Sequence, residues 1–173
     1  IVVPEVAREL ISSGICPWDS SWKGTTDFQK HILFNILRKE ASFFEVLSDM
    51  DIKGKQVVFL CDRGIPDGQA YCGQTEFANL LASLGITLHD VIERYDQVIH
   101  LVTAAMGAEE FYVTDEERHE TLAQARDLDL ATRAAWNTLT NTSCLLIIVV
   151  HLMRRYFAHY LHSNELFLWK LTH

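Results

Sequence analysis

Residues 56–64 read QVVFLCDRG, an apolar run that ends abruptly in an acidic, a basic and a glycine residue. The run is too continuous for a strand with one face in water, and it is typical of a buried strand in a parallel sheet. In open sheets of this kind, ligands collect at the carboxyl ends of the strands. The stretch therefore predicts an α/β fold with Asp62 and Arg63 at the edge where a ligand binds.

On both sides of this stretch, strand-like and helix-like segments alternate along the chain. Short apolar runs predict strands at 1–3 and 97–102, and helical spacing of apolar residues predicts helices over 6–11, 26–49, 75–84, 88–94 and 121–139. Thr26 and Gln29 have the spacing of a capping box at the start of the longest helix. This alternation favours βαβ units, so the predicted class is α/β with a parallel sheet.

The overall composition indicates one globular domain with an acidic balance of charge. The 173 residues carry 15 Lys and Arg against 23 Asp and Glu, a formal net charge of −8, and 49% of them are hydrophobic. This balance argues against a protein that holds nucleic-acid phosphates with a broad basic face. The four cysteines form no C-x-x-C pair and are interpreted as reduced thiols, which favours a cytoplasmic location.

The composition changes near residue 141. Residues 1–143 carry 12 basic and 22 acidic side chains, whereas residues 144–173 carry three basic and one acidic. The apolar run at 144–153 falls well short of the roughly 20 residues that a membrane helix needs. We therefore expect a domain over residues 1–140 and a divergent apolar and basic tail over 141–173, which is either a further strand or disordered.

Asp62 and Arg63 are the first candidates for the chemistry. Several apolar residues followed by Asp form the Walker B arrangement, in which the carboxylate holds Mg²⁺, often through water. As a catalytic residue, Asp62 would orient this metal ion or accept the proton of a substrate hydroxyl. Arg63 has the planar, bidentate donors that bind a phosphate. The alternative is an ordinary surface turn, because the pattern is a loose one.

Three further charged residues are candidates for a phosphate site. Arg118 and Arg126 lie around the start and on the face of the last predicted helix, and arginines of such a lid neutralise phosphoryl charge. The alternative for both is a solvent-exposed face laced with acidic residues. Glu5 follows the first strand and either lines the crevice or favours the start of a helix through the helix dipole. His100, within a predicted strand, is expected to be a hydrogen-bonded core residue.

No phosphate-binding loop of the form G-x-x-x-x-G-K-[ST] occurs in the sequence. Such a loop supplies a backbone cradle and a lysine for the phosphates of a nucleotide. The 173 residues therefore offer neither of these two parts of a nucleotide site.

Several segments, in order along the chain, resemble a P-loop NTPase-like AAA domain. They are residues 1–5 (IVVPE), 59–72 with the Asp-Arg-Gly run, 95–105 (YDQVIHLVTAA), 107–112 (GAEEFY), 118–120 (RHE) and 125–129 (ARDLD). This domain occurs in the TRPL translocation defect protein 14 family and, more distantly, in nicotinamide-riboside-kinase-type enzymes. The resemblance extends from Ile1 to about Trp136.

The resemblance implies a three-layer αβα fold that binds GTP or ATP with Mg²⁺. By position, Asp62 resembles the Walker B acid and metal ligand, Arg63 its phosphate-facing neighbour, and Arg118 and Arg126 residues of a lid-like region. The family is linked to phosphoinositide binding and intracellular protein transport, and this domain usually precedes one like the triphosphate tunnel enzymes. The implied partners are a purine nucleotide, a phosphoinositide membrane surface and trafficking cargo.

Two departures from the family accompany this resemblance. The family's first strand, P-loop and first helix would lie before Ile1, and residues 138–173 do not match the family. We therefore expect a truncated domain that is inactive as written. Three functions stay open, namely a trafficking switch or adaptor, a phosphotransferase acting on a nucleoside-like small molecule, and a fragment without function whose central strand edge is exposed.

Overall fold

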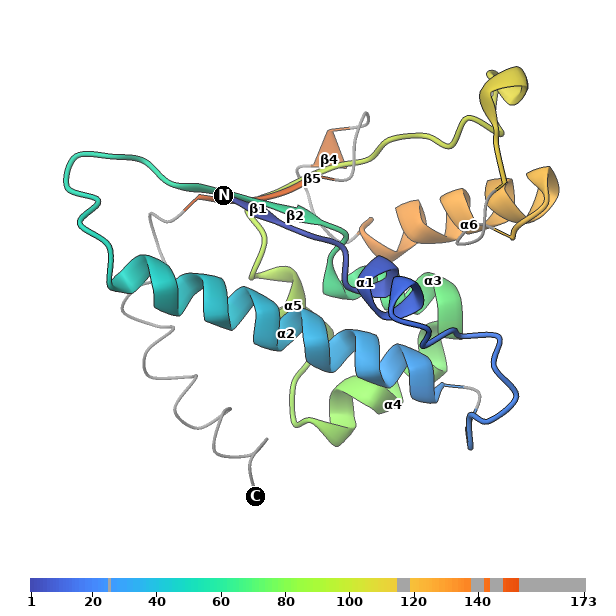
Figure 1. Ribbon diagram of the computed structural model, residues 1–173, viewed down its shortest axis with the longest axis horizontal. Helices are drawn as coiled ribbons and strands as arrows, with labels where there is room; N and C mark the ends of the chain where they lie inside the picture. Colours follow the sequence, from blue (N-terminus) through green and yellow to red (C-terminus); the bar gives the residue numbers. More distant parts are fainter. Residues whose placement is uncertain (25, 115–118, 138–141, 144–147, 153–173) are drawn as a thin grey trace.

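Strands and helices alternate along the chain in the computed structural model, which describes residues 1–24, 26–114, 119–137, 142–143 and 148–152. The elements are β1 (Val2–Val3), α1 (Val6–Ser12), α2 (Asp27–Ser48), β2 (Val58–Asp62), α3 (Gly68–Cys72), α4 (Gln74–Ser83), α5 (Leu88–Ile92), β3 (Gln97–Ile99), α6 (Leu122–Ala135), β4 (Thr142–Ser143) and β5 (Ile148–Leu152), with 3₁₀ turns at Ile65–Asp67 and Glu109–Phe111. This mixed architecture, with a small, mainly parallel sheet and several helices, confirms the predicted fold class (Figure 1).

Over the described residues, the sheet has five strands in the order β1-β2-β5-β3-β4. β1 pairs with β2 and β3 pairs with β4 in parallel, whereas β5 runs antiparallel to both of its neighbours. Residues 144–147 alone separate β4 from β5. β5 runs opposite to β4 across this short separation in sequence, and β3 lies between the two strands in the sheet. The predicted parallel sheet therefore carries one antiparallel strand at its centre.

The tail predicted over residues 141–173 is described at 142–143 and 148–152. Both segments are strands of the sheet, and β5 pairs with β2 from Val58 to Asp62 on the edge opposite β1. The predicted boundary near residue 140 and the rest of the tail lie outside the described residues. Within the part of the chain that the structure describes, no helix has both the length and the hydropathy to cross a membrane.

The core forms where α2 packs beneath the strands. This helix runs below β1 and β2 in the view of Figure 1, and its buried apolar residues are Phe28, Ile32, Leu33, Ile36, Leu37, Ala41 and Leu47. In β2, Phe59 and Cys61 are buried, whereas Val58 and Leu60 on the other face are half-buried. The strand is thus fully buried on one face, rather than on both as its continuous apolar sequence predicts.

β3 ends at Ile99, three residues before the predicted end of the strand. The Asp129 carboxylate on α6 lies 3.1 Å from His100 Nε2 and accepts a hydrogen bond of 2.8 Å from the Thr103 N–H. These two contacts direct the chain out of the sheet toward α6. His100 is buried as predicted, but its Nδ1 atom has no hydrogen-bond partner.

Two expectations about local structure differ from what the structure shows, one at the start of α2 and one directly after β2. Thr26 does not cap α2 with its side chain; its backbone is helical (φ −104°, ψ −1°), and the Gly24 N–H donates to the Asp27 carboxylate instead. Residues 65–72, for which the sequence predicts no element, form a 3₁₀ turn and α3. The local sequence pattern therefore predicts a side-chain cap that does not form at α2, and it misses the short helical segment that follows β2.

Candidate functional site

The parallel pairing of β1 with β2 brings their carboxyl ends together. Val3 is opposite Cys61 in the register, so the residues that follow the two strands leave the sheet side by side. Glu5 Oε1 lies 3.9 Å from Arg63 Nε, across this pair of strand ends. Three of the residues predicted from the sequence, Glu5, Asp62 and Arg63, thus meet at one edge of the sheet, where α/β folds bind ligands.

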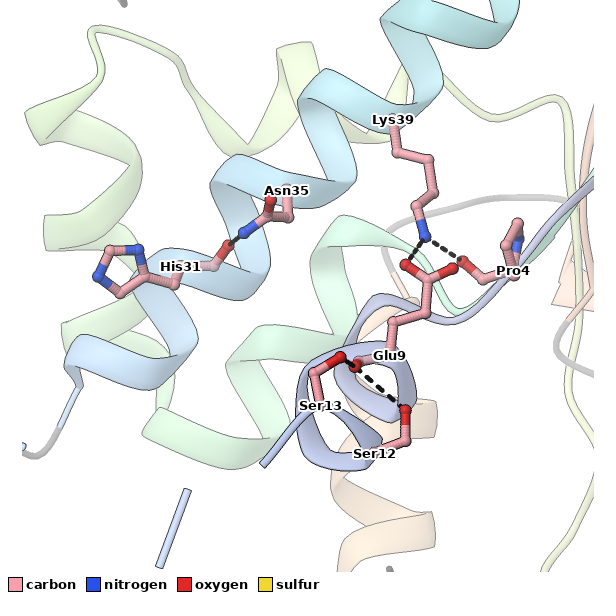
Figure 2. A network of polar contacts seen from close by, with 7 residues as sticks. All are labelled: Pro4, Glu9, Ser12, Ser13, His31, Asn35 and Lys39. Carbon is pink, nitrogen blue, oxygen red and sulfur yellow. Dashed lines mark hydrogen bonds and ion pairs between the residues drawn. The ribbon is translucent and has the colours of Figure 1, made fainter. Parts of the chain in front are cut away.

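The turn that carries Glu5 is attached to α2. Lys39 on α2 forms an ion pair with Glu9 on α1 and donates a hydrogen bond of 3.4 Å to the Pro4 carbonyl. Figure 2 shows these contacts, with the lysine side chain reaching from α2 toward the start of α1. The end of β1 and the first turn of α1 are therefore held in place directly beside Glu5.

Arg63 has an unusual backbone conformation. Its φ is 70°, and no other described residue apart from glycine has a positive φ. Left-handed geometry is uncommon for side chains with a Cβ atom, and strained residues of this kind cluster at active sites and ligand clamps. The Arg63 side chain is 37% exposed, so the guanidinium is accessible from solvent at the end of β2.

Asp67 is a fourth member of this cluster, which the sequence reasoning does not assign to the site. It is 4% exposed, and its Oδ2 atom lies 3.6 Å from Arg63 Nη1 without a hydrogen-bond partner. The Trp136 Nε1–H donates to Asp67 Oδ1 at 2.5 Å. The spacing of Arg63 and Asp67, four residues apart, is the one sequence signal that links the two side chains.

The charges of this Arg63 cluster, Glu5, Asp62, Arg63 and Asp67, do not balance. Burial raises the pKa of the Glu5 carboxyl, and the neighbouring Asp62 and Asp67 raise it further, against the opposing effect of Arg63. Burial also raises the pKa of Asp67, while Arg63 and the Trp136 hydrogen bond lower it. Three carboxyl groups around one guanidinium favour a cation or a protonated carboxyl at this edge of the sheet.

The residues of this cluster suit a magnesium ion that arrives with a ligand. Carboxylate oxygens are the ligands that Mg²⁺ prefers, and the ion is usually held by one or two carboxylates together with water and phosphate oxygens. Over the described residues, no group of three or more His, Cys, Asp or Glu side chains converges as a ready-made metal cage. Asp62, which is exposed at the end of β2, is the accessible carboxylate of the cluster.

The polar contacts of Arg126 are with Ala105 and Glu109, not with residues of the Arg63 cluster. Its Nε donates to the Ala105 carbonyl at 2.5 Å, and its Nη2 lies 2.8 Å from Glu109 Oε1. Arg126 lies ten residues before Trp136, which is about 15 Å along the axis of α6. The arginine therefore ties α6 to the segment after β3. Arg118, the other predicted lid residue, lies outside the described residues.

Comparison with known protein families gives a match over most of the chain. A family model described as an AAA domain matches residues 1–152, which ends at the last residue of β5. Neither the search of curated proteins nor the search of solved structures gave a match. The matched range includes the whole Arg63 cluster and the five strands of the described sheet. The expectation that residues from 138 onward do not match the family is therefore wrong for residues 138–152.

Proposed function

The chain belongs to the AAA domain family, and on this premise we propose that it binds a purine nucleotide, GTP or ATP, at the carboxyl ends of β1 and β2. The family indicates nucleotide binding at a general level. We assign the nucleotide to this edge of the sheet because of the Arg63 cluster, in which a partly exposed arginine lies beside the exposed carboxylate of Asp62. Arginine beside a strand-terminal Asp is suited to a phosphate that carries a divalent cation.

Each residue of the cluster has a role in this proposal. Arg63 binds a phosphate, since its two carboxylate partners lie 3.6 and 3.9 Å away, farther than a close hydrogen bond. Asp62 holds Mg²⁺ through water, and Glu5 adds negative charge on the side of β1. When bound with the nucleotide, Mg²⁺ neutralises phosphate charge. Arg118 and Arg126 are proposed as residues of the lid-like region.

The cellular role is proposed from the resemblance to the TRPL translocation defect protein 14 family. On this basis the protein acts in intracellular trafficking as a nucleotide-dependent switch or adaptor with a phosphoinositide-linked membrane partner. Residues 1–140 are proposed as the nucleotide-binding unit and residues 141–173 as a divergent tail. The competing function is a phosphotransferase, favoured by the exposure of Asp62, which leaves its carboxylate accessible to the hydroxyl of a nucleoside-like substrate.

Nucleotide binding is tested by NMR titration of the 173-residue chain with MgATP and MgGTP. We expect shifts at residues 5 and 62–67, with a dissociation constant weaker than micromolar, because the sequence contains no glycine-rich phosphate loop. Arg63→Ala should weaken binding about tenfold, the loss of one charged hydrogen-bonding partner. Asp62→Asn should remove the difference between titrations with and without Mg²⁺.

A matched control is Arg38→Ala, which removes an exposed arginine on α2 beside Phe34. This variant should bind like the wild type. The absence of shifts at the cluster up to about 10 mM nucleotide would refute the proposal, since weaker binding has no physiological meaning. Transfer of phosphate to a nucleoside would favour the phosphotransferase, whereas slow hydrolysis with transfer to water alone would favour the switch.

A further inference from the structure

We propose that Tyr95, held by the buried carboxylate of Glu40, is a positioning residue for Arg63. This inference rests on the proposed function, because it assumes that Arg63 binds the phosphate of the ligand. Tyr95 does not touch the predicted site directly. It acts on the backbone of the loop at residues 63–67, which begins at Arg63.

The contact between Tyr95 and this loop is a single buried hydrogen bond. The Ile65 N–H donates to the Tyr95 hydroxyl oxygen at 3.0 Å, two residues beyond Arg63. The Tyr95 hydroxyl in turn donates to Glu40 Oε1 at 2.8 Å. Tyr95 is 3% exposed and Glu40 is 1% exposed, so water does not compete for either bond. The hydroxyl uses its donor and one of its acceptor sites at the same time, which fixes its orientation.

Glu40 is itself fixed from the opposite side. Its Oε2 atom accepts hydrogen bonds from Arg94 Nε at 3.0 Å and Arg94 Nη2 at 2.6 Å. Both donors of the guanidinium thus converge on one carboxylate oxygen, and hydrogen bonds between charged groups are roughly twice as strong as neutral ones. The chain of contacts thus runs from Arg94 through Glu40 and Tyr95 to the amide of Ile65, and it connects α2 to the loop after β2.

Aromatic rings complete the support under the loop. A Cβ atom at Gly64 would lie 2.7 Å from the Trp136 ring and 3.3 Å from the Tyr95 ring, so the loop passes directly over both. The two rings pack edge to face with their centroids 5.2 Å apart. Packing alone therefore limits how far the loop can move toward the core, and the Tyr95 hydroxyl adds a directional bond to it.

An apolar core would not need this arrangement. Replacing a buried charged network by apolar side chains of similar volume is often neutral or stabilising, because the charges no longer have to be desolvated. Tyr95 and Glu40 supply something that an apolar pair does not, a fixed acceptor for one backbone N–H. That N–H lies next to the left-handed turn at Arg63, where the surrounding structure must over-determine a strained backbone.

The test uses Tyr95→Phe in the full chain, which keeps the ring against Trp136 and removes the hydroxyl. We expect amide hydrogen exchange at residues 63–67 to become about tenfold faster, and MgATP binding to weaken about tenfold, the loss of one buried hydrogen bond. In an Arg63→Ala background, the same substitution should leave MgATP binding unchanged. A side chain with a merely structural role would weaken binding equally in both backgrounds.

Tyr112→Phe is the matched control, because it removes a hydroxyl that donates to the Glu120 carbonyl at 2.9 Å. It should change neither exchange at 63–67 nor the affinity for MgATP. Equal weakening by Tyr95→Phe with and without Arg63 would overturn the proposal. If Tyr95→Phe fails to fold, Glu40→Gln replaces it, since the single amide oxygen of glutamine cannot accept from both Arg94 and Tyr95. Exchange at the Ile65 amide should then become faster, and unchanged exchange there would overturn the inference.

The failure of the proposed function would look different. If the wild type binds neither MgATP nor MgGTP, the role assigned to Arg63 is wrong. Amide hydrogen exchange at Ile65 then tests the claim that is left, that Tyr95 positions the loop at residues 63–67. Faster exchange in Tyr95→Phe, with α6 unchanged, would still support a positioning role of Tyr95 for the loop. Unchanged exchange at Ile65 would overturn that role independently of nucleotide binding.

Discussion

At the scale of single residues, the positive charge of Arg63 is shared between carboxylates that compete for it. Glu5 and Asp67 lie 3.9 and 3.6 Å from its guanidinium nitrogens, and Asp62 adds a further negative charge nearby. An incoming phosphate must therefore displace part of this pairing, whereas a divalent cation is attracted by three carboxyl groups and repelled by the one guanidinium. This balance explains why we assign the edge to a phosphate together with Mg²⁺ rather than to a bare anion.

Cys61, one residue before Asp62, should be chemically inert in the folded protein. Burial raises the pKa of its thiol to about 12, and the Glu40 carboxylate contributes to this rise. Because the thiolate is the reactive form, iodoacetamide at pH 8.5 should leave Cys61 unmodified in the native chain. Peptide mapping by mass spectrometry measures the modification, with the urea-unfolded chain, in which Cys61 should react, as the control.

The same shift gives a dependence of stability on pH. The ordinary thiol pKa is 9.0, so the unfolded chain loses this proton earlier than the folded chain as the pH rises. The contribution of Cys61 is fully present below pH 9.0 and is lost as the pH rises toward about 12. Rapid alkylation of native Cys61 would contradict the burial that causes both effects.

The sequence predicts the part of this site that lies at strand ends, because an apolar run followed by a charged residue can be recognised locally. Contacts between segments far apart in the chain leave no such local pattern. Asp62, Arg63 and Glu5 each follow an apolar run, and parallel strands place their carboxyl ends together. Asp67 and Tyr95 carry no such signal. Trp136 reaches Asp67 across 69 residues of chain, and Tyr95 reaches Ile65 across 30, so their roles depend on packing between distant segments.

At the scale of elements, helix starts show why a local pattern succeeds at one place and fails at another. Thr121 has an extended backbone, and its hydroxyl oxygen accepts a hydrogen bond from the Gln124 N–H. The Gln124 side-chain oxygen in turn accepts one from the Thr121 N–H, which completes a capping box. Thr26 has the same spacing to a Gln, but its helical backbone does not direct the hydroxyl toward the free amides. Backbone conformation before the helix, and not the pattern alone, decides whether a cap forms.

Thr121→Ala should therefore destabilise the protein, whereas Thr26→Ala should not. Loss of the cap at Thr121 leaves an amide of the first turn of α6 without its partner, and we expect the free energy of unfolding to fall by about 1 kcal/mol. Thr26→Ala is the matched control, since the Thr26 side chain makes no capping hydrogen bond. Urea unfolding followed by circular dichroism measures both; an equal loss in the two variants would show that the caps do not differ.

At the scale of the whole molecule, the sheet depends on its central strand. β1 and β2 form one parallel pair, β3 and β4 form another, and β5 is the strand that joins the two pairs. Its backbone is paired on both sides, with Val150 opposite Leu60 on β2 and Gln97 on β3. Strand alternation predicts a parallel sheet and leaves a further strand open in the tail, but it predicts neither β4 nor the entry of β5 between the two pairs in the opposite direction.

This arrangement predicts that a proline in β5 is far more damaging than one in β4. Val150→Pro removes an N–H from a strand with neighbours on both sides, and proline is tolerated in sheets essentially at edges. We expect the free energy of unfolding to fall by about 2 kcal/mol or more, the cost of an unpaired backbone group in the sheet together with distortion of the strand. Thr142→Pro is the control, because β4 is paired in the described sheet on the side of β3 alone, and it should cost less than half as much by urea unfolding. Equal effects of the two prolines would show that β5 does not join the two pairs of strands. The carboxyl end of β2, which carries Asp62 and Arg63, would then be held by β1 and by the contacts of Tyr95 and Trp136 with the loop at residues 63–67.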